Sequence, residues 1–188
     1  DDTRHYLNGI FLHLTEAHGR NFLTGVATDS HRLSSSSIEI ENIENFTSLI
    51  LPRKTVFQLC SLLAESNEKL SMQTSENKVK FILGKIKLIS KVIDGKFPDY
   101  KKVVPAKNEK SLIVSSKDFI NSIERVTSVS LDRKEGVKLV IDKDKIQLSV
   151  NSANSGEGNE IIKASFNSSN LNISFNSKYL VDIASEVE

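Results

Sequence analysis

The chain has 188 residues, of which 38% are hydrophobic and 26% are charged, and its formal net charge at pH 7 is +1. This length allows one large domain or two small ones, and the composition is that of a soluble globular protein. No stretch of about 18 consecutive apolar residues is present to span a membrane. A net charge this small provides no global field to attract nucleic acid, so any such contact must come from a local group of basic side chains.

The start of the chain and its cysteine content indicate where the protein works. The chain starts at Asp1 without an initiator methionine or an apolar leader, so we expect it to begin inside a longer protein rather than with a signal peptide. The single cysteine, Cys60, cannot form an internal disulfide, which suits a reducing cytoplasm.

A polar turn lies between two strand-like segments, residues 24–28 and 33–40. The turn, Thr-Asp-Ser-His-Arg at 28–32, places two hydroxyls, a carboxylate, an imidazole and a guanidinium in five residues. A turn alone does not need so many donors and acceptors. The turn is therefore either a catalytic cluster or one wall of a binding pocket.

Catalysis by this turn would make the chain a hydrolase with Asp29, Ser30 and His31 as its triad. Neighbouring side chains on an extended chain point to opposite faces, and no Gly-x-Ser-x-Gly motif is present. The simpler alternative is an Asx-turn, in which the Asp29 carboxylate accepts hydrogen bonds from nearby backbone N–H groups. The remaining histidines lack metal-ligand spacing and the glycines form no phosphate-binding loop, so we expect neither metal nor cofactor.

A short apolar strand, a helix-start signal, a lysine and an amphipathic helix recur three times along the chain. Lys54, Lys117 and Lys178 mark the three copies and are 63 and 61 residues apart. A period near 60 residues predicts that one supersecondary unit is reused. The start signals are Pro52, then Ser115 or Ser116, then Asn176 or Ser177.

Each predicted helix has an apolar stripe, which we expect to face a sheet. The stripes consist of Val56, Leu59, Cys60 and Leu63 in the first helix, Phe119, Ile120, Ile123 and Val126 in the second, and Leu180, Ile183, Ala184 and Val187 in the third. Strands are predicted over 70–74, 78–83 and 85–92, and again over 137–141, 145–150 and 160–166, with 151–159 as a loop. Short strands joined by tight turns predict antiparallel sheets covered by helices, which is an α+β fold.

Residues 94–109 differ in composition from the segments on either side, with two prolines, several charges and little periodicity. We expect an ordered linker here, between a domain of residues 1–105 and a second domain of residues 110–188. Phe97, Tyr100, Val103 and Val104 are expected to hold the linker against a surface, because a flexible linker rarely carries so much apolar area.

Four motifs, at residues 3–9, 26–33, 51–54 and 93–100, are similar in order and spacing to those of a known family. They read Thr-Arg-His-Tyr-Leu-Asn-Gly, Val-Ala-Thr-Asp-Ser-His-Arg-Leu, Leu-Pro-Arg-Lys and Ile-Asp-Gly-Lys-Phe-Pro-Asp-Tyr. The chain resembles the bacterial DNA polymerase III beta subunit, the sliding clamp family, over essentially its whole length. Residues 1–105 resemble most of the middle domain, and residues 110–188 resemble the first part of the third domain.

The resemblance implies a DNA clamp fold, with two helix-plus-sheet units per domain and a head-to-tail homodimer closed into a ring around duplex DNA. It implies a non-catalytic processivity factor of the polymerase holoenzyme, located in the bacterial cytoplasm at the nucleoid. Tethering would raise the polymerase's effective concentration at the primer end, and contacts to the DNA backbone alone would permit sliding. Expected partners are the replicative polymerase, the clamp loader and repair polymerases, through short peptides of the type Gln-Leu-Xaa-Leu-Phe.

The resemblance also assigns residues to a peptide-binding pocket between the middle and third domains. The matching positions are Arg4, Leu7, Thr28, Ser30, His31, Arg32, Leu33, Pro98 and Val103. The apolar members would form a floor for an anchor side chain, and the polar members would orient the peptide. One position departs from the family, which usually has glycine where this chain has Ser30. A side chain there would narrow the pocket, or restrict the turn if the position requires a positive φ.

The DNA-facing positions carried over from the family are His5, Tyr6, Arg53 and Lys54, and the repeat adds Lys117, Arg125 and Lys178. Equivalent positions in a repeat could line one surface that meets phosphates, although basic helix faces are often simply solvated. Val129 and Ser130 align with a ring-closing region, where the family can place a bulky apolar residue at Ser130. Two alternatives remain: the Asp29, Ser30 and His31 hydrolase, and a structural α+β repeat protein without a DNA role.

Overall fold

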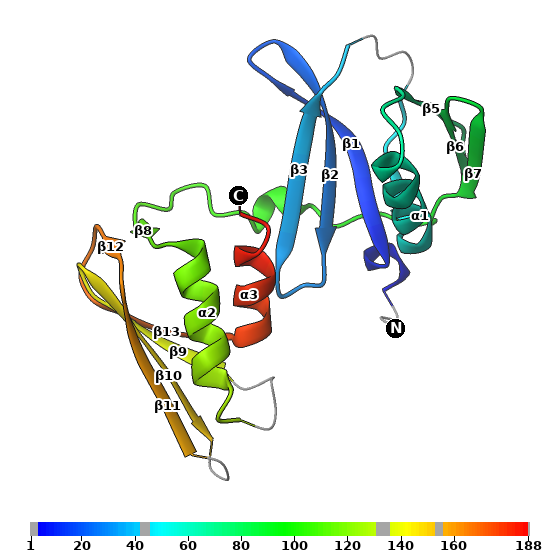
Figure 1. The fold of residues 1–188 in the computed structure, drawn as a ribbon. Coiled ribbons are helices and arrows are strands. Elements are labelled where there is room, and N and C mark those ends of the chain that lie inside the picture. The colour runs from blue at the N-terminus through cyan, green and yellow to red at the C-terminus, as the bar shows by residue number, and fades with distance from the viewer. Residues whose placement is uncertain (1–3, 42–45, 131–135, 153–155, 188) are drawn as a thin grey trace. The chain divides into compact units, whose positions relative to one another are not determined.

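A computed structural model describes residues 4–41, 46–130, 136–152 and 156–187. The chain divides into two compact units, Asp1–Val103 and Val104–Glu188, and each combines helices with antiparallel sheets (Figure 1). The predicted α+β fold class is confirmed. Within those four ranges, no helix is both long and apolar enough to cross a membrane.

The main sheet of the first unit has the strand order β3-β2-β1-β4. Its strands are β1 (Gly9–Ala17), β2 (Arg20–Thr28), β3 (Leu33–Glu39) and β4 (Leu49–Pro52). The β2–β3 register pairs Thr28 with Leu33, so the polar turn noticed in the sequence closes this hairpin. The hairpin therefore carries the turn's side chains at one end of the sheet.

Helix α1 (Arg53–Ala64) begins directly after Pro52, whose φ of −60° suits a helix entry. It contacts β1 and β4, and a core of Leu49, Leu51, Leu59, Val79 and Phe81 links these elements to a second sheet. That sheet consists of β5 (Leu70–Thr74), β6 (Lys78–Leu83) and β7 (Ile86–Lys91). The predicted strands in this region are confirmed.

The predicted apolar stripe of α1 is partly wrong. Thr55 and Leu59 are its buried residues, whereas Cys60 is exposed and Leu63 is 40% exposed. Successive helical residues are about 100° apart, so the residue after Leu59 is turned away from the sheet that Leu59 contacts. Leu63 lies in the last turn of the helix.

A third cluster in the first unit holds the start of the predicted linker against the main sheet. Val26, Ile50 and Phe97 are its buried members, and the Phe97 ring stacks on the Phe11 ring with centroids 4.9 Å apart. Val103, however, is 71% exposed. Tyr100 is half-buried and packs against this cluster, so only the first part of the linker is held as predicted. Val104 is likewise 47% exposed.

The second unit packs α2 (Ser116–Thr127) and α3 (Ser177–Ala184) with a sheet of order β11-β10-β9-β13. Its strands are β9 (Gly136–Ile141), β10 (Lys145–Ser152), β11 (Gly156–Lys163) and β13 (Leu171–Asn176), and the short β8 (Leu112–Ile113) pairs with β12 (Ser165–Phe166). Ile123 and Val126 of α2 are buried in the core of this unit. The N-caps are Ser115, which accepts from the Asp118 N–H, and Asn176, which accepts from the Lys178 N–H.

Two expectations for the second unit are wrong. Of the segment predicted as a loop over 151–159, the described residues continue β10 and β11, and Ser152 pairs with Gly156, while 153–155 lie outside the described residues. These strand ends consist of polar and glycine residues. They therefore lack the alternation of apolar and polar side chains from which a strand is predicted. Ile183 and Val187, predicted to face inward, are 55% and 60% exposed.

The strand-then-helix repeat is present in the structure. β4, β8 and β13 are followed by α1, α2 and α3, and Lys54, Lys117 and Lys178 each occupy the second position of their helix. All three lysines are exposed. The period of about 60 residues in the sequence therefore corresponds to a repeated strand-then-helix unit in the structure.

Candidate functional site

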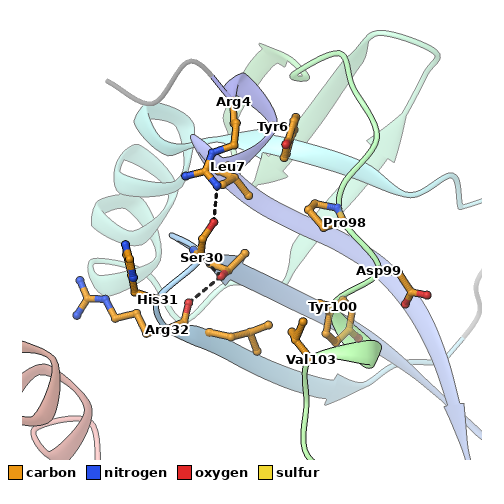
Figure 2. Close-up of a pocket in the computed structure, with 12 residues that line it drawn as sticks. Arg4, Tyr6, Leu7, Ser30, His31, Arg32, Pro98, Asp99, Tyr100 and Val103 are labelled. Carbon is orange, nitrogen blue, oxygen red and sulfur yellow. Dashed lines mark hydrogen bonds between the residues drawn. The ribbon is translucent and has the colours of Figure 1, made fainter. Parts of the chain in front are cut away.

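A hollow of about 390 Å³ in the first unit is lined by three chain segments that are far apart in the sequence. They are residues 4–7 before β1, the turn and strand start at 28–33, and residues 98–103 after β7 (Figure 2). The hairpin β2–β3 presents the turn, and the Phe97 anchor holds the third segment near it. The site therefore depends on packing between segments near the start and near the end of the first unit's sequence.

All nine residues that the resemblance assigned to a pocket line this hollow. Three further residues complete it: Tyr6, Asp99 and Tyr100. Tyr6 was predicted to face DNA, yet it lines the hollow and packs against the Phe97 cluster. Asp99 and Tyr100 belong to the fourth motif, so their presence in that motif was a signal that could have assigned them.

Asp29 organises the turn. One oxygen of its carboxylate accepts from the backbone N–H groups of His31 and Arg32, each at 3.0 Å. The other oxygen accepts from Arg32 Nε at 3.1 Å. The predicted Asx-turn is confirmed, and it fixes the backbone that carries the His31 and Arg32 side chains.

The environment of Asp29 favours its ionised form. Burial by itself raises the pKa of a carboxyl, but the backbone hydrogen bonds from His31 and Arg32, with the Arg32 guanidinium, lower the pKa of Asp29 below its ordinary value. The carboxylate therefore remains charged at neutral pH and holds the turn.

Ser30 adopts a left-handed backbone conformation with φ of +75°. Its hydroxyl accepts a hydrogen bond from Arg4 Nη1 at 2.6 Å (Figure 2). A guanidinium is permanently protonated and cannot act as a general base, while the Asp29 carboxylate is used by the turn. This arrangement does not activate Ser30 as a nucleophile, so the geometry gives the hydrolase alternative no support.

A second hydrogen-bond pair supports the opposite wall of the hollow. The Nε2 atom of His13 on β1 is hydrogen-bonded to the Tyr100 hydroxyl at 3.0 Å, and either atom can be the donor. The Nδ1 atom of the same ring lies 3.1 Å from the Leu14 carbonyl oxygen. Burial, followed by the nearby Asp99 carboxylate, raises the pKa of Tyr100, so the phenol stays protonated. His13 was considered in the sequence only as a metal ligand, and its role in holding Tyr100 was missed.

The predicted DNA-facing residues lie outside the hollow, apart from Tyr6. His5 is exposed in a single 3-10 turn, His5–Leu7. The Arg53 guanidinium lies over the Phe57 ring at 5.3 Å from its centroid, an exposed cation–π contact that leaves the charge at the surface. These positions remain predicted DNA contacts.

Arg125 differs from the other predicted basic contacts because an acidic residue neutralises it. Its Nε donates to Glu160 Oε2 at 3.0 Å, and its Nη2 donates to Glu160 Oε1. The hydrogen bond from Arg125, opposed by burial and aided by the Ser122 hydroxyl, lowers the pKa of Glu160. A phosphate would have to compete with this carboxylate for the guanidinium.

The two residues predicted for ring closure pack inside the second unit. Ser130 is 8% exposed, and Val129 lies against the core formed by Ile123 and its neighbours. The assignment to a dimer contact remains a prediction. Among the residues with described positions, no group of three or more His, Cys, Asp and Glu side chains could hold a metal ion.

Two family models cover nearly the whole chain. The model of the DNA polymerase III beta subunit central domain matches residues 1–99, and the model of the C-terminal domain matches residues 101–188. The chain belongs to the DNA polymerase III beta subunit family.

Curated relatives and solved beta subunit structures agree with this assignment. The chain is 34% identical over 188 residues to the beta sliding clamp of Caulobacter vibrioides, covering 100% of this chain and 50% of that protein. It is 30% identical over 183 residues to the Pseudomonas aeruginosa beta sliding clamp, covering 97% and 49%. A Bartonella birtlesii sliding clamp bound to griselimycin matches with a TM-score of 0.94 at 39% identity, over 100% of this chain and 51% of that chain. The chain spans about half the length of the beta subunits it matches.

Proposed function

We propose that this chain is part of a bacterial sliding clamp that encircles duplex DNA and tethers partner proteins through the hollow on its first unit. The observation that carries this proposal is the convergence of the nine assigned pocket residues, from three separate segments, on one hollow. The two units take the places of the middle and third domains of the family. The protein acts by binding and has no catalytic role of its own.

The chemistry of the hollow suits a short peptide with an apolar anchor. Leu7, Leu33 and Val103 supply apolar surface, and Arg4 and Arg32 supply charged donors at the same hollow. Binding sites of this kind bury an apolar group at their centre and orient the ligand with a few polar contacts. A peptide of the type Gln-Leu-Xaa-Leu-Phe presents two apolar side chains and main-chain carbonyls to such a surface.

The repeated lysines suit a surface that meets DNA without reading its sequence. Lys54, Lys117 and Lys178 occupy the same helical position in three copies of one unit. Lysine contacts to phosphates provide affinity without sequence specificity, which sliding requires. The complete protein would form a homodimeric ring in the cytoplasm, at the nucleoid, with the replicative polymerase, the clamp loader and repair polymerases as partners.

Peptide binding to the full-length protein tests this function directly. Val103 and Val104 offer a matched pair, since both are exposed but only Val103 lines the hollow. Val103→Glu should weaken a fluorescent Gln-Leu-Xaa-Leu-Phe peptide about 10-fold in an anisotropy titration, the equivalent of one lost valine contact. Val104→Glu should leave the affinity unchanged. Equal effects of the two substitutions, or no binding by the unsubstituted protein, would contradict the proposed function.

A further inference from the structure

Ser30 combines a rare backbone conformation with a specific side-chain contact. Its φ of +75° lies in the left-handed region, which residues with a Cβ seldom adopt. Its hydroxyl oxygen accepts from Arg4 Nη1 at 2.6 Å, across 26 positions of sequence. Both residues line the hollow, so the contact joins two of its three walls.

The turn supports this contact through a chain of hydrogen bonds. The Ser30 N–H donates to Thr28 Oγ1 at 3.1 Å, and the Thr28 hydroxyl donates to the Arg32 carbonyl oxygen at 2.7 Å. The Asp29 carboxylate holds the Arg32 N–H from the other side. These bonds fix the Ser30 backbone, which limits its hydroxyl to the few staggered positions that one side-chain torsion allows.

We propose that Ser30 positions the Arg4 guanidinium at the hollow and is thereby a specificity-determining residue for the peptides bound there. The proposal rests on the proposed function. A guanidinium has five N–H donors in a rigid planar fork, so the bond from Nη1 to Ser30 helps to set the orientation of the whole group. A donor fixed in advance binds an acceptor at a lower entropic cost than a mobile one. The favoured ligands are peptides that place a carboxylate or a main-chain carbonyl oxygen against Arg4.

A steric role for Ser30 makes a different prediction from this positioning role. If the Cβ narrows the hollow, Ser30→Ala keeps the peptide affinity of the unsubstituted protein, whereas Ser30→Gly changes it. If the hydroxyl positions Arg4, both substitutions lower the peptide affinity equally. Glycine also adopts positive φ freely, so Ser30→Gly removes the hydroxyl without straining the turn.

The decisive experiment measures peptide affinity and Arg4 order together in the full-length protein. Ser30→Ala and Ser30→Gly should each weaken Gln-Leu-Xaa-Leu-Phe peptide binding about 5-fold, as expected for one partly exposed hydrogen bond to a charged group. Arg4→Ala should weaken binding at least as much, and adding Ser30→Ala to it should cause no further loss. Without peptide, the NMR signal of the Arg4 side chain should show faster motion in both Ser30 variants.

The outcomes separate the two proposals. Unchanged affinity in both Ser30 variants, with binding by the unsubstituted protein intact, would overturn the positioning role and leave the proposed function standing. Tighter binding by Ser30→Gly alone would also overturn it, because the Cβ would then be an obstruction. Absence of peptide binding by the unsubstituted protein would overturn both proposals. A loss of affinity in both variants without a fall in melting temperature would support the positioning role.

Discussion

Asp29→Ala should destabilise the first unit by removing the acceptor that holds the polar turn. The substitution deletes two hydrogen bonds from backbone N–H groups at 3.0 Å and an ion pair with Arg32 at 3.1 Å. Each hydrogen bond contributes about 0.5–1 kcal/mol net. The ion pair adds at most about 0.5 kcal/mol, because water screens partners whose side chains are 45% and 35% exposed. The expected loss is about 2 kcal/mol in the free energy of unfolding.

Asp29→Asn is the matched control for charge. Its side-chain carbonyl still accepts from the backbone N–H groups, so the turn is kept and only the charged contact with Arg32 is lost. The expected cost at pH 7 is about 0.5 kcal/mol, which is the screened ion-pair contribution. Thermal unfolding followed by circular dichroism resolves the two substitutions, since about 1 kcal/mol shifts the melting temperature of a protein of this size by 2–4 °C.

The pH dependence provides a second check. The pKa of Asp29 is lowered in the folded state, so its stabilising contribution is fully present above its unfolded pKa of about 3.9. It is lost as the pH falls through the lower folded value, because the folded and unfolded states then bind the same proton. The difference between the unsubstituted protein and Asp29→Asn should therefore shrink below about pH 4. An equal difference at pH 7 and at the acid limit, or no destabilisation by Asp29→Ala, would refute this account of the turn.

Three further sets of substitutions test packing and DNA contact. Phe97→Ala should cost about 3 kcal/mol in the free energy of unfolding, because its ring is 7% exposed; Phe97→Leu should cost less than about 1.5 kcal/mol, and equal losses in urea unfolding would contradict the anchor role. Gly158→Ala places a Cβ 2.5 Å from a carbonyl oxygen of α2 and should cost about 2 kcal/mol, whereas Gly136→Ala finds 3.7 Å of room. Similar melting temperatures for the two alanine variants would count against that close approach. Charge reversal of Arg53 and Lys54 together in the full-length protein should lower DNA affinity and flatten its salt dependence; unchanged binding isotherms from low to high salt would remove these residues from the DNA surface.

Local patterns in the sequence were sufficient for most of the fold. Alternating side chains predicted β5 and β6 at their observed bounds. The helix-start signals also matched, and both Ser115 and Asn176 act as caps. These signals are local, because a helix cap or an alternating strand can be recognised from a few neighbouring residues.

Long-range contacts explain what the sequence did not predict. The sequence predicted the Asx-turn, but not that the Ser30 hydroxyl would meet Arg4, 26 residues away. The contact between His13 and Tyr100 spans 87 residues and has no local pattern. The family resemblance named nine of the residues that line the hollow, because a family motif specifies positions that are far apart in the sequence. It assigned Tyr6, which also lines the hollow, to the DNA surface.

We propose that the complete protein holds DNA by encircling it. The most direct measurement compares how long the full-length protein, placed by its clamp loader, remains on circular and on linear duplex DNA at high salt. Electrostatic contacts weaken steeply with salt, whereas a closed ring leaves circular DNA only by opening. A ring that encircles DNA should remain long on the circle and should be lost rapidly after a single cut linearises it. Equal dissociation rates from both forms would contradict it.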